Sequence, residues 1–194
     1  MDAIILAAGY ATRLYPLTEN MPKPLLSVAG KPIIAHIIRK MEQIAAIGKI
    51  YIVTNSKFEQ HFKKWLQDFS SEKPIEIVND GTKSNEDRLG AMGDVHCAIN
   101  SKNLKDDIIV VAGDNLFELS LADIFNFFKK RNSNVIVLHD VKDLELARHY
   151  GIVEIDNSVV VNFEEKPLSP KSTLASTGIY LFPKKTIQLI NKYI

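Results

Sequence analysis

The sequence predicts an α/β fold: a mostly parallel sheet flanked by helices, with an antiparallel part toward the C-terminus. Two observations carry this prediction. As far as residue 139, short apolar runs alternate with segments of helical periodicity, and beyond it the apolar runs follow one another closely. Alternating strands and helices favour a parallel sheet covered on both faces, and an added antiparallel part is common in mixed sheets.

Strands are expected where compact apolar runs end at turn residues. The run from Ala3 to Ala7 breaks at Gly9, and the run from Ile108 to Ala112 stops at Gly113. Runs of this length, bounded in this way, are typical of buried strands. The strands expected on this ground span residues 3–7, 49–54, 75–78, 108–112, 135–139, 151–155, 159–163 and 178–182.

Helices are expected where apolar residues recur every three or four positions. Between Pro32 and Ile47 they keep this spacing, and Gly48 ends the pattern. The basic cluster at 129–131 ends another such segment, where cations complement the helix dipole. This favours a helix end over a nucleic-acid contact. The helices expected span residues 32–47, 58–69, 89–99, 121–130 and 184 to the end.

The composition suits one globular domain. Of 194 residues, 46% are hydrophobic, and 24 basic residues nearly balance 23 acidic ones. A nucleic-acid-binding protein usually shows a basic excess. Cys97 is the sole cysteine, which fits a reducing setting. Neither a signal peptide nor an apolar window of about 20 residues is present. We therefore expect a cytoplasmic protein without nucleic-acid or membrane partners.

The loop after the first expected strand has the character of a phosphate-binding loop. Small residues precede Thr12 and Arg13. Small residues let backbone N–H groups approach an anion, and an arginine adds a forked cation. In open α/β sheets, ligands bind beyond the carboxyl ends of the strands. The glycine patterns of P-loops and dinucleotide folds are absent, so a tight turn without a ligand stays an alternative on spacing alone.

A proline-rich segment follows this loop. Pro16, Pro22 and Pro24 restrict the backbone and discourage helix formation between them. A long rigid loop beside the end of a strand is more often functional than not. Lys23, held between two prolines, is therefore a candidate to meet an anion.

The segment from Leu6 to Pro32 resembles the signature of the sugar-1-phosphate nucleotidyltransferases, which include glucose-1-phosphate thymidylyltransferases and uridylyltransferases. It carries Leu-Ala-Ala-Gly, Thr-Arg-Leu-Tyr-Pro-Leu-Thr, Pro-Lys-Pro-Leu and Gly-Lys-Pro in the family's order. The resemblance implies a Rossmann-like, nucleotide-diphospho-sugar transferase type of sheet. It also implies that Arg13 steadies the departing pyrophosphate and that Lys23 contacts the reacting α-phosphate region. The nucleotide contacts that it implies are Leu6, Ala8, Gly9, Tyr10, Ala11, Thr12, Arg13, Asn79, Leu89 and Gly90.

Two positions in this loop depart from the family pattern. Many members have glycine where this chain has Ala11, and a small residue where it has Tyr10. Alanine fits a tight loop if its φ stays negative. We therefore expect altered detail at this loop and not lost function.

Asp114 follows a buried strand and the turn residue Gly113. Magnesium prefers hard oxygen ligands, often one or two carboxylates with phosphate oxygens and water. An Asp-Asn turn that satisfies its own backbone explains the same residues equally well. The family carries Gly-Asp-Asn here, so the resemblance implies that Asp114 is catalytic and binds Mg²⁺.

Three short motifs in the strand-rich part resemble the family's acceptor half. They are Tyr150-Gly151, Glu164-Glu165-Lys166-Pro167 and Ser176-Thr177-Gly178. Each is weak alone, because such residues are common in solvated turns and bulges. By resemblance, Glu165 binds sugar hydroxyls and Lys166 the sugar phosphate. The substrate-binding residues implied are Gly151, Glu165, Lys166, Thr177 and Gly178.

The segment from Asn79 to Asp94 departs most from the family. It resembles the base-reading region, yet Arg88 stands where a glycine is typical. That glycine lets the base come close, so the sequence leaves both the base and the sugar undetermined. A structural bridge from Arg88 to Asp87 or Glu86 is an equal alternative to a functional role.

The resemblance implies one domain over residues 1–194, with a nucleotide-binding part to about 140 and a sugar-phosphate-binding part from about 141. The reaction implied transfers a nucleoside monophosphate to a sugar-1-phosphate and releases pyrophosphate. Two alternatives stay open: a phosphocholine-like acceptor, or a catalytically reduced module that binds nucleotide sugars. The family usually continues further and includes another metal-binding aspartate, so either the chain is truncated or its metal site is completed differently. Relatives often form dimers or tetramers, but the sequence maps no interface.

Overall fold

The computed structural model describes residues 1–193, which form two compact units. Unit 1 comprises Met1–Val135 and the chain from Leu181 onward, and unit 2 comprises Ile136–Tyr180. The sequence divided the chain once, near residue 140, whereas the structure returns the C-terminal helix to unit 1. Contacts within unit 1 account for this: the Thr186 hydroxyl donates to Asn134 at 2.6 Å, and the Lys184 N–H donates to Asp107 at 3.0 Å.

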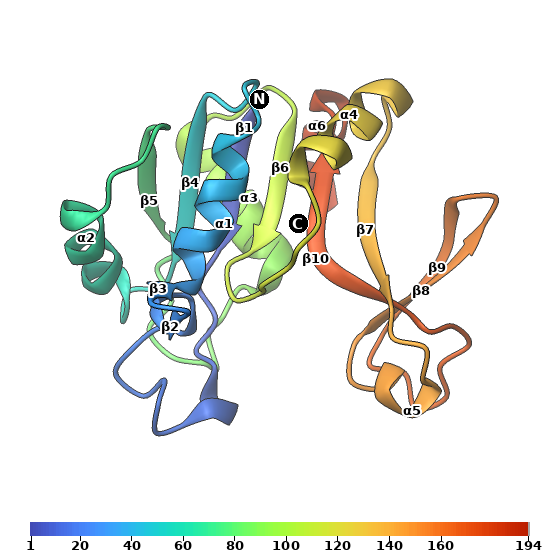
Figure 1. The fold of residues 1–194 in the computed structure, drawn as a ribbon, viewed down its shortest axis with the longest axis horizontal. Coiled ribbons are helices and arrows are strands. Elements are labelled where there is room, and N and C mark those ends of the chain that lie inside the picture. Colours follow the sequence, from blue (N-terminus) through green and yellow to red (C-terminus); the bar gives the residue numbers. More distant parts are fainter. Residues whose placement is uncertain (194) are drawn as a thin grey trace. The chain divides into compact units, whose positions relative to one another are not determined.

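Four parallel strands form the sheet of unit 1, in the order β5-β4-β1-β6 (Figure 1). They are β1 (Asp2–Leu6), β4 (Lys49–Thr54), β5 (Ile75–Asn79) and β6 (Ile108–Ala112). Leu6 lies opposite both Val53 and Ala112, and Thr54 lies opposite Asn79. The carboxyl ends of the four strands are therefore level, and the loops that follow them share one edge of the sheet. The prediction of a parallel sheet is confirmed.

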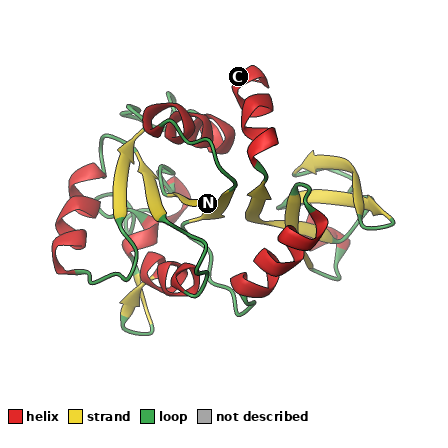
Figure 2. Cartoon of the chain, turned by 90° about the horizontal axis from the view of Figure 1, so that it is seen from above, coloured by secondary structure: helices red, strands yellow, loops and turns green. Residues whose placement is uncertain are grey.

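Helices cover both faces of this sheet (Figures 1 and 2). In Figure 1, α1 (Ile33–Glu42) lies in front of the strands and α3 (Gly90–Lys102) behind them. The other helices of unit 1 are α2 (Glu59–Asp68), α4 (Leu121–Arg131) and α6 (Lys184–Tyr193). The basic cluster lies in the last turn of α4, as predicted. Ile194 lies outside the described residues, and no described helix is long and apolar enough to cross a membrane.

Helix α1 is shorter than the apolar periodicity predicts. It ends at Glu42, and residues 43–47 form turns in which the Ile44 N–H donates to the Met41 carbonyl and the Ile47 N–H to the Ile44 carbonyl. Ile44 and Ile47 are nevertheless buried, at 2% and 1% exposure. The expected helix end near Ile47 was wrong. The spacing of apolar residues indicates which residues are buried, and residues after the end of the helix are also buried.

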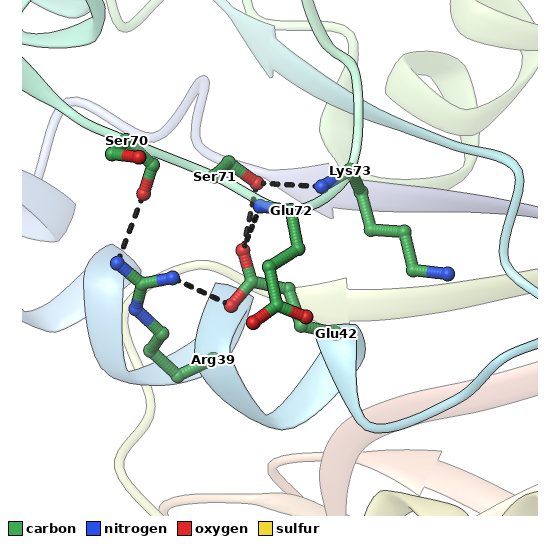
Figure 3. A network of polar contacts seen from close by, with 6 residues as sticks. All are labelled: Arg39, Glu42, Ser70, Ser71, Glu72 and Lys73. Carbon is green, nitrogen blue, oxygen red and sulfur yellow. Dashed lines mark hydrogen bonds and ion pairs between the residues drawn. The ribbon is translucent and has the colours of Figure 1, made fainter.

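Glu42 ties the end of α1 to the segment that precedes β5 (Figure 3). Its side chain is 5% exposed and accepts from Arg39, Ser71 and the Glu72 N–H at 2.8–2.9 Å. Burial alone raises the pKa of this carboxyl, but the three hydrogen bonds outweigh it and the net pKa is lowered. The ionised side chain thus fixes where the chain enters the edge strand of the sheet.

Unit 2 is built from strands and one short helix. Its elements are β7 (Val135–Asp140), α5 (Leu144–Ala147), β8 (Gly151–Asp156), β9 (Val159–Glu165) and β10 (Leu174–Phe182). β8 pairs antiparallel with β9 and with β10, and β7 pairs with β10. This confirms the predicted antiparallel part. β10 starts four residues before the expected Gly178, and α5, which Asp143 caps, was not predicted.

Candidate nucleotide-binding and acceptor sites

The loop after β1 is held open by neighbouring strands. Ala7 donates its N–H to the Val53 carbonyl, and the fully buried Asn55 side chain donates to the Ala8 carbonyl at 2.8 Å. A Cβ added at Gly9 would meet no protein atom within 4 Å. The position where a side chain would lie at Gly9 is therefore open space. A loop needs such space if a ligand is to come close to its backbone.

Ala11 adopts the left-handed conformation, with φ 48° and ψ 40°. The expectation that its φ stays negative was wrong. Ala11 is the N-cap of the 3₁₀ helix that follows, η1 (Thr12–Leu14). The fully buried Thr18 donates its hydroxyl to the Ala11 carbonyl at 2.7 Å and holds the residue in place. This conformation costs a non-glycine residue roughly 1–2 kcal/mol, so the loop is strained where many relatives have glycine.

A cavity of about 300 Å³ opens beside this loop. Its lining comes from the loop after β1, the proline-rich segment, the end of β6 and the segment between β5 and α3. The lining residues are Leu6, Ala7, Ala8, Gly9, Ala11, Lys23, Pro24, Asp80, Arg88, Gly90, Ala91, Asp94, Ala112 and Asp114. Of the predicted nucleotide-site residues, the cavity thus brings together Leu6, Ala8, Gly9, Ala11, Lys23, Gly90 and Asp114.

Lys23 and Asp114 meet at this cavity. The Lys23 Nζ lies 2.8 Å from the Asp114 Oδ2, across 91 residues of sequence. Lys23 begins a second 3₁₀ helix, η2 (Lys23–Leu25), between the buried Pro22 and Pro24. The prolines were expected to prevent helix formation, but proline is tolerated in the first turn of a helix.

Gly113 explains how Asp114 comes so close to β1. Its N–H donates to the Leu6 carbonyl at 2.8 Å, and a Cβ at this position would lie 2.8 Å from that same oxygen. Only glycine fits without displacing the β1 backbone. Asp114 is thereby delivered to the edge of the sheet at the end of β1.

Several predicted residues lie outside the cavity lining. Thr12 and Arg13 are exposed on η1, and Leu89 is 48% exposed before α3. Asn79 holds the chain after β5, because its side chain accepts from Ser56 and from the Gly81 N–H and donates to Glu59.

Tyr10 is 4% exposed, and its ring packs against Phe58. Its hydroxyl lies 3.3 Å from the Thr82 hydroxyl, and burial raises the pKa of this phenol. The Tyr10 side chain therefore belongs to the protein interior, and Tyr10 is not among the residues that line the cavity.

Arg88 lines the cavity and donates to the Asn85 side chain at 2.9 Å. Arg88 therefore contacts Asn85 and not Asp87 or Glu86, the salt-bridge partners considered from the sequence. Asp87 instead accepts from the Lys83 and Ser84 N–H groups, which lowers its pKa.

Two carboxyl groups in the cavity lining were not predicted. Asp80 follows β5, and Asp94 lies one turn into α3 with 7% exposure. Burial, together with the charge of Asp80, raises the pKa of Asp94 to about 7. One sequence signal could have indicated Asp94. It lies beside Val95 in a segment whose apolar spacing predicts burial, and an acidic residue is rarely buried unless it is paired.

The predicted acceptor-end residues lie in unit 2. Gly151 pairs with Glu165 across β8 and β9, and a Cβ on Gly151 would lie 2.9 Å from the Glu165 Oε2 and 2.7 Å from the Phe163 ring. Lys166 has a left-handed φ of 49°, donates its N–H to the Tyr150 carbonyl and pairs with Glu165 at 2.9 Å. Gly151, Glu165 and Lys166 therefore form one cluster.

Thr177 and Gly178 lie inside β10. The Thr177 hydroxyl donates to the Val137 carbonyl of β7 at 2.9 Å, and Gly178 has a φ of 72°. The positive φ explains why glycine occupies this position.

A strand-end loop facing a cavity, with a paired lysine and aspartate at that cavity, is typical of α/β proteins that bind ligands beyond the carboxyl ends of their strands. The chain belongs to the nucleotidyl transferase family, whose model matches residues 2–194. It is 36% identical to a bifunctional protein GlmU from Methanocaldococcus jannaschii over 99% of this chain and 42% of that protein. It is 34% identical to a putative mannose-1-phosphate guanyltransferase from Sulfolobus acidocaldarius over 99% of this chain and 50% of that protein.

A crystal structure with a similar fold agrees with the family. A putative glucose-1-phosphate thymidylyltransferase from Bacillus anthracis, solved in complex with sucrose, superposes with a TM-score of 0.83 and 28% identity, covering 100% of this chain and 76% of that one. The predicted fold class is thereby confirmed. The chain spans about half the length or less of the two curated relatives named above.

Proposed function

We propose that this chain transfers a nucleoside monophosphate from a nucleoside triphosphate to a sugar-1-phosphate, forming a nucleotide sugar and pyrophosphate. The observation that carries the proposal is the pairing of Lys23 with Asp114 at a cavity bordered by the loop after β1. At the carboxyl edge of a parallel sheet, a lysine can offset the charge of a triphosphate, and a carboxylate can hold a metal ion that would do the same.

The chemistry is a displacement at the α-phosphorus. An oxygen of the sugar phosphate forms a bond to that phosphorus while the bond to the pyrophosphate oxygen breaks, so no covalent enzyme intermediate is needed. Catalysis of this kind rests on positioning and charge stabilisation. Lys23 offsets charge near the α-phosphate, and Arg13, exposed on η1, reaches the pyrophosphate.

The residues present fit a magnesium ion. The Asp114 side chain is 43% exposed, with Oδ2 on Lys23, and it lines the cavity. Within residues 1–193, no three His, Cys, Asp or Glu side chains gather into a metal cage. Mg²⁺ is often bound by one or two carboxylates together with substrate phosphates and water, a role that the accessible Asp114 carboxylate suits. Bound there, the ion would neutralise charge that builds up on the phosphate oxygens.

The acceptor half of the proposal rests on the cluster in unit 2. The Glu165 carboxylate is an acceptor for sugar hydroxyls, and the Lys166 ammonium is a donor for the sugar phosphate. The two side chains are 62% and 47% exposed, so they are accessible to a substrate.

Pyrophosphate release with Mg²⁺, over a matrix of nucleoside triphosphates and sugar-1-phosphates, tests the proposal. We expect one pair to give a sugar-dependent signal that Lys23→Ala abolishes and that Lys64→Ala, on the exposed side of α2, leaves unchanged. A signal with phosphocholine and none with sugars would move the assignment to a non-sugar acceptor. Nucleotide binding without pyrophosphate release would overturn catalysis by this chain.

A further inference from the structure

Asp80 and Asp94 form a carboxyl pair in the lining of the nucleotide cavity. Asp80 follows β5, whereas Asp114 follows β6 at the other end of the order β5-β4-β1-β6. Three strand spacings separate those two strand ends, which is about 14 Å. The carboxyl pair and the Lys23–Asp114 pair therefore lie on opposite sides of the cavity.

One oxygen of the buried Asp94 carboxyl lacks a hydrogen-bond partner among the described residues. The residue is 7% exposed, and its Oδ1 accepts no hydrogen bond from the described residues. Burial, the neighbouring charge of Asp80 and a hydrogen bond between the two side chains raise its pKa from 3.8 to about 7. Buried polar atoms without a partner are rare and costly, so a ligand with an N–H group is the simplest way to satisfy this one.

A buried network fixes the orientation of Asp80. Its Oδ1 accepts from both the N–H and the hydroxyl of Thr82, each at 2.8 Å. The Thr82 hydroxyl lies 3.3 Å from the hydroxyl of Tyr10, and both residues are 4% exposed. Because the Thr82 hydroxyl donates to Asp80, the Tyr10 hydroxyl donates to Thr82. Tyr10 thus supports this carboxylate.

The charges decide which part of a nucleotide can lie here. On one side of the cavity Asp80 and ionised Asp94 carry two negative charges against the one positive charge of Arg88. On the other side Lys23 offsets Asp114, so a triphosphate is repelled less there. The uncharged base is the part of the nucleotide that suits the Asp80 and Asp94 side. Family membership does not fix which base, since the relatives described above are named for guanylyl and thymidylyl transfer.

Resting on the proposed nucleotidyl transfer, we propose that Asp94 and Asp80 read the base and select one that carries an exocyclic amino group. Above pH 7 Asp94 is ionised, and an ionised carboxylate only accepts hydrogen bonds. Cytosine, adenine and guanine offer an amino donor, and Asp pairs with the cytosine amino group in nucleic-acid recognition. Uracil and thymine offer the O4 carbonyl at the corresponding position, which meets carboxylate oxygens unfavourably.

Isothermal titration calorimetry of the chain with CTP, ATP, GTP, UTP and dTTP, at pH 8 in Mg²⁺ and without sugar phosphate, tests this inference, because Asp94 is ionised at that pH. We expect at least one amino-bearing nucleotide to bind at least ~10-fold more tightly than UTP and dTTP, since one good base contact discriminates by about 1–3 kcal/mol. In Asp94→Asn the new amide N–H₂ can donate to O4, so that ratio should fall at least ~10-fold. Glu86→Gln, an exposed carboxylate in the same segment, should leave the ratio unchanged.

Each other outcome is informative. Tightest binding of UTP or dTTP by the wild type would overturn base reading while leaving nucleotidyl transfer intact. Selective binding of an amino-bearing nucleotide without pyrophosphate release would keep base reading and overturn the proposed reaction. If Mg²⁺ alone binds the wild type and not Asp94→Asn, with the nucleotide ratio unaltered, the pair is a cation site and the inference is wrong. Absence of any nucleotide binding would overturn both proposals.

Discussion

The ammonium of Lys23 lies 2.8 Å from a carboxylate oxygen of Asp114, although 91 residues separate them. Their side chains are 30% and 43% exposed, so the pair is open to solvent and to ligands. An exposed pair of this kind contributes only about 0–1 kcal/mol to stability. Folding therefore depends little on this pair, and both side chains line the cavity.

Replacing either partner should separate activity from stability. We expect Lys23→Met and Asp114→Asn each to lower pyrophosphate release by about 10²–10³-fold, as losing a preorganised charge contact does. The melting temperature should stay near that of the wild type, since the pair is solvent-screened. Lys64→Met removes a comparable exposed charge and should change neither quantity. Near-normal turnover in Asp114→Asn would contradict the site.

The strain at Ala11 can be measured directly. Ala11→Gly removes the left-handed penalty of roughly 1–2 kcal/mol but loosens the unfolded chain by about 0.4–1 kcal/mol, so the net change should be neutral to stabilising. Ala11→Val should be clearly destabilising because β-branched residues resist positive φ. Ala35→Gly within α1 is the matched control and should lose about 1 kcal/mol. Urea denaturation measures the free energy of unfolding of all three variants. A destabilised Ala11→Gly would contradict the left-handed backbone at Ala11.

Glu42 should stabilise the fold in its ionised form. Glu42→Gln is expected to cost about 1.5–3 kcal/mol near pH 7, as hydrogen bonds to charged groups do. The folded pKa is lowered, so this stability is present above the ordinary value of 4.5 and is lost as the pH falls through the folded pKa. The two proteins should therefore converge in acid. Glu145→Gln alters the exposed Arg148–Glu145 pair with the same i,i+3 spacing and should cost less than about 1 kcal/mol.

Asp94 should have the opposite dependence on pH. Its folded pKa is raised from 3.8 to about 7, so its ionisation lowers stability progressively across that window. The free energy of unfolding of Asp94→Asn, relative to that of the wild type, should therefore rise between pH 4 and pH 8. The size of the pKa shift limits this rise to at most about 4 kcal/mol. Thermal melts at each pH measure this gain, with the exposed Asp68→Asn as control. A difference that does not vary with pH would show that Asp94 is not shifted.

Gly151 should matter for the acceptor more than for folding. Gly151→Ala places a Cβ against the ends of the Glu165 and Phe163 side chains, which can swing aside. The fold should survive, but Glu165 would be displaced. A displacement of about 1 Å can cost up to 10²-fold, so we expect the KM for the sugar phosphate to rise and the affinity for the nucleotide to be unchanged. An unaltered KM would remove Glu165 from the acceptor site.

Elements governed by local pattern were predictable from the sequence. The strands at 49–54 and 108–112 were predicted with the boundaries that the structure shows. Turn residues bound these runs, and their apolar character is continuous, so neighbouring residues alone decide them. The contiguous loop motif likewise predicted the family, because a long pattern of residue types in fixed order does not depend on tertiary contacts.

The end of α1, the backbone of Ala11 and the division into units depended on contacts distant in sequence. Ile44 and Ile47 keep a helical spacing while the chain turns, and Ala11 takes a positive φ because Thr18 and the following turn hold it. Residues 181–193 join unit 1 through Asn134 and Asp107. These partners are distant in sequence, so the residues on either side of a segment cannot predict them.

The sequence by itself determined an α/β chain, its family and the residue types that meet phosphate. Only the tertiary structure decided that Lys23 touches Asp114, because that contact needs the parallel register of β1 with β6 and the bare backbone of Gly113. It alone decided that Asp80 and Asp94 share the cavity, since the packing of α3 beside the end of β5 buries one carboxyl next to the other. Strand register and helix packing are set by burial over the whole chain, and that information is not carried by any single segment.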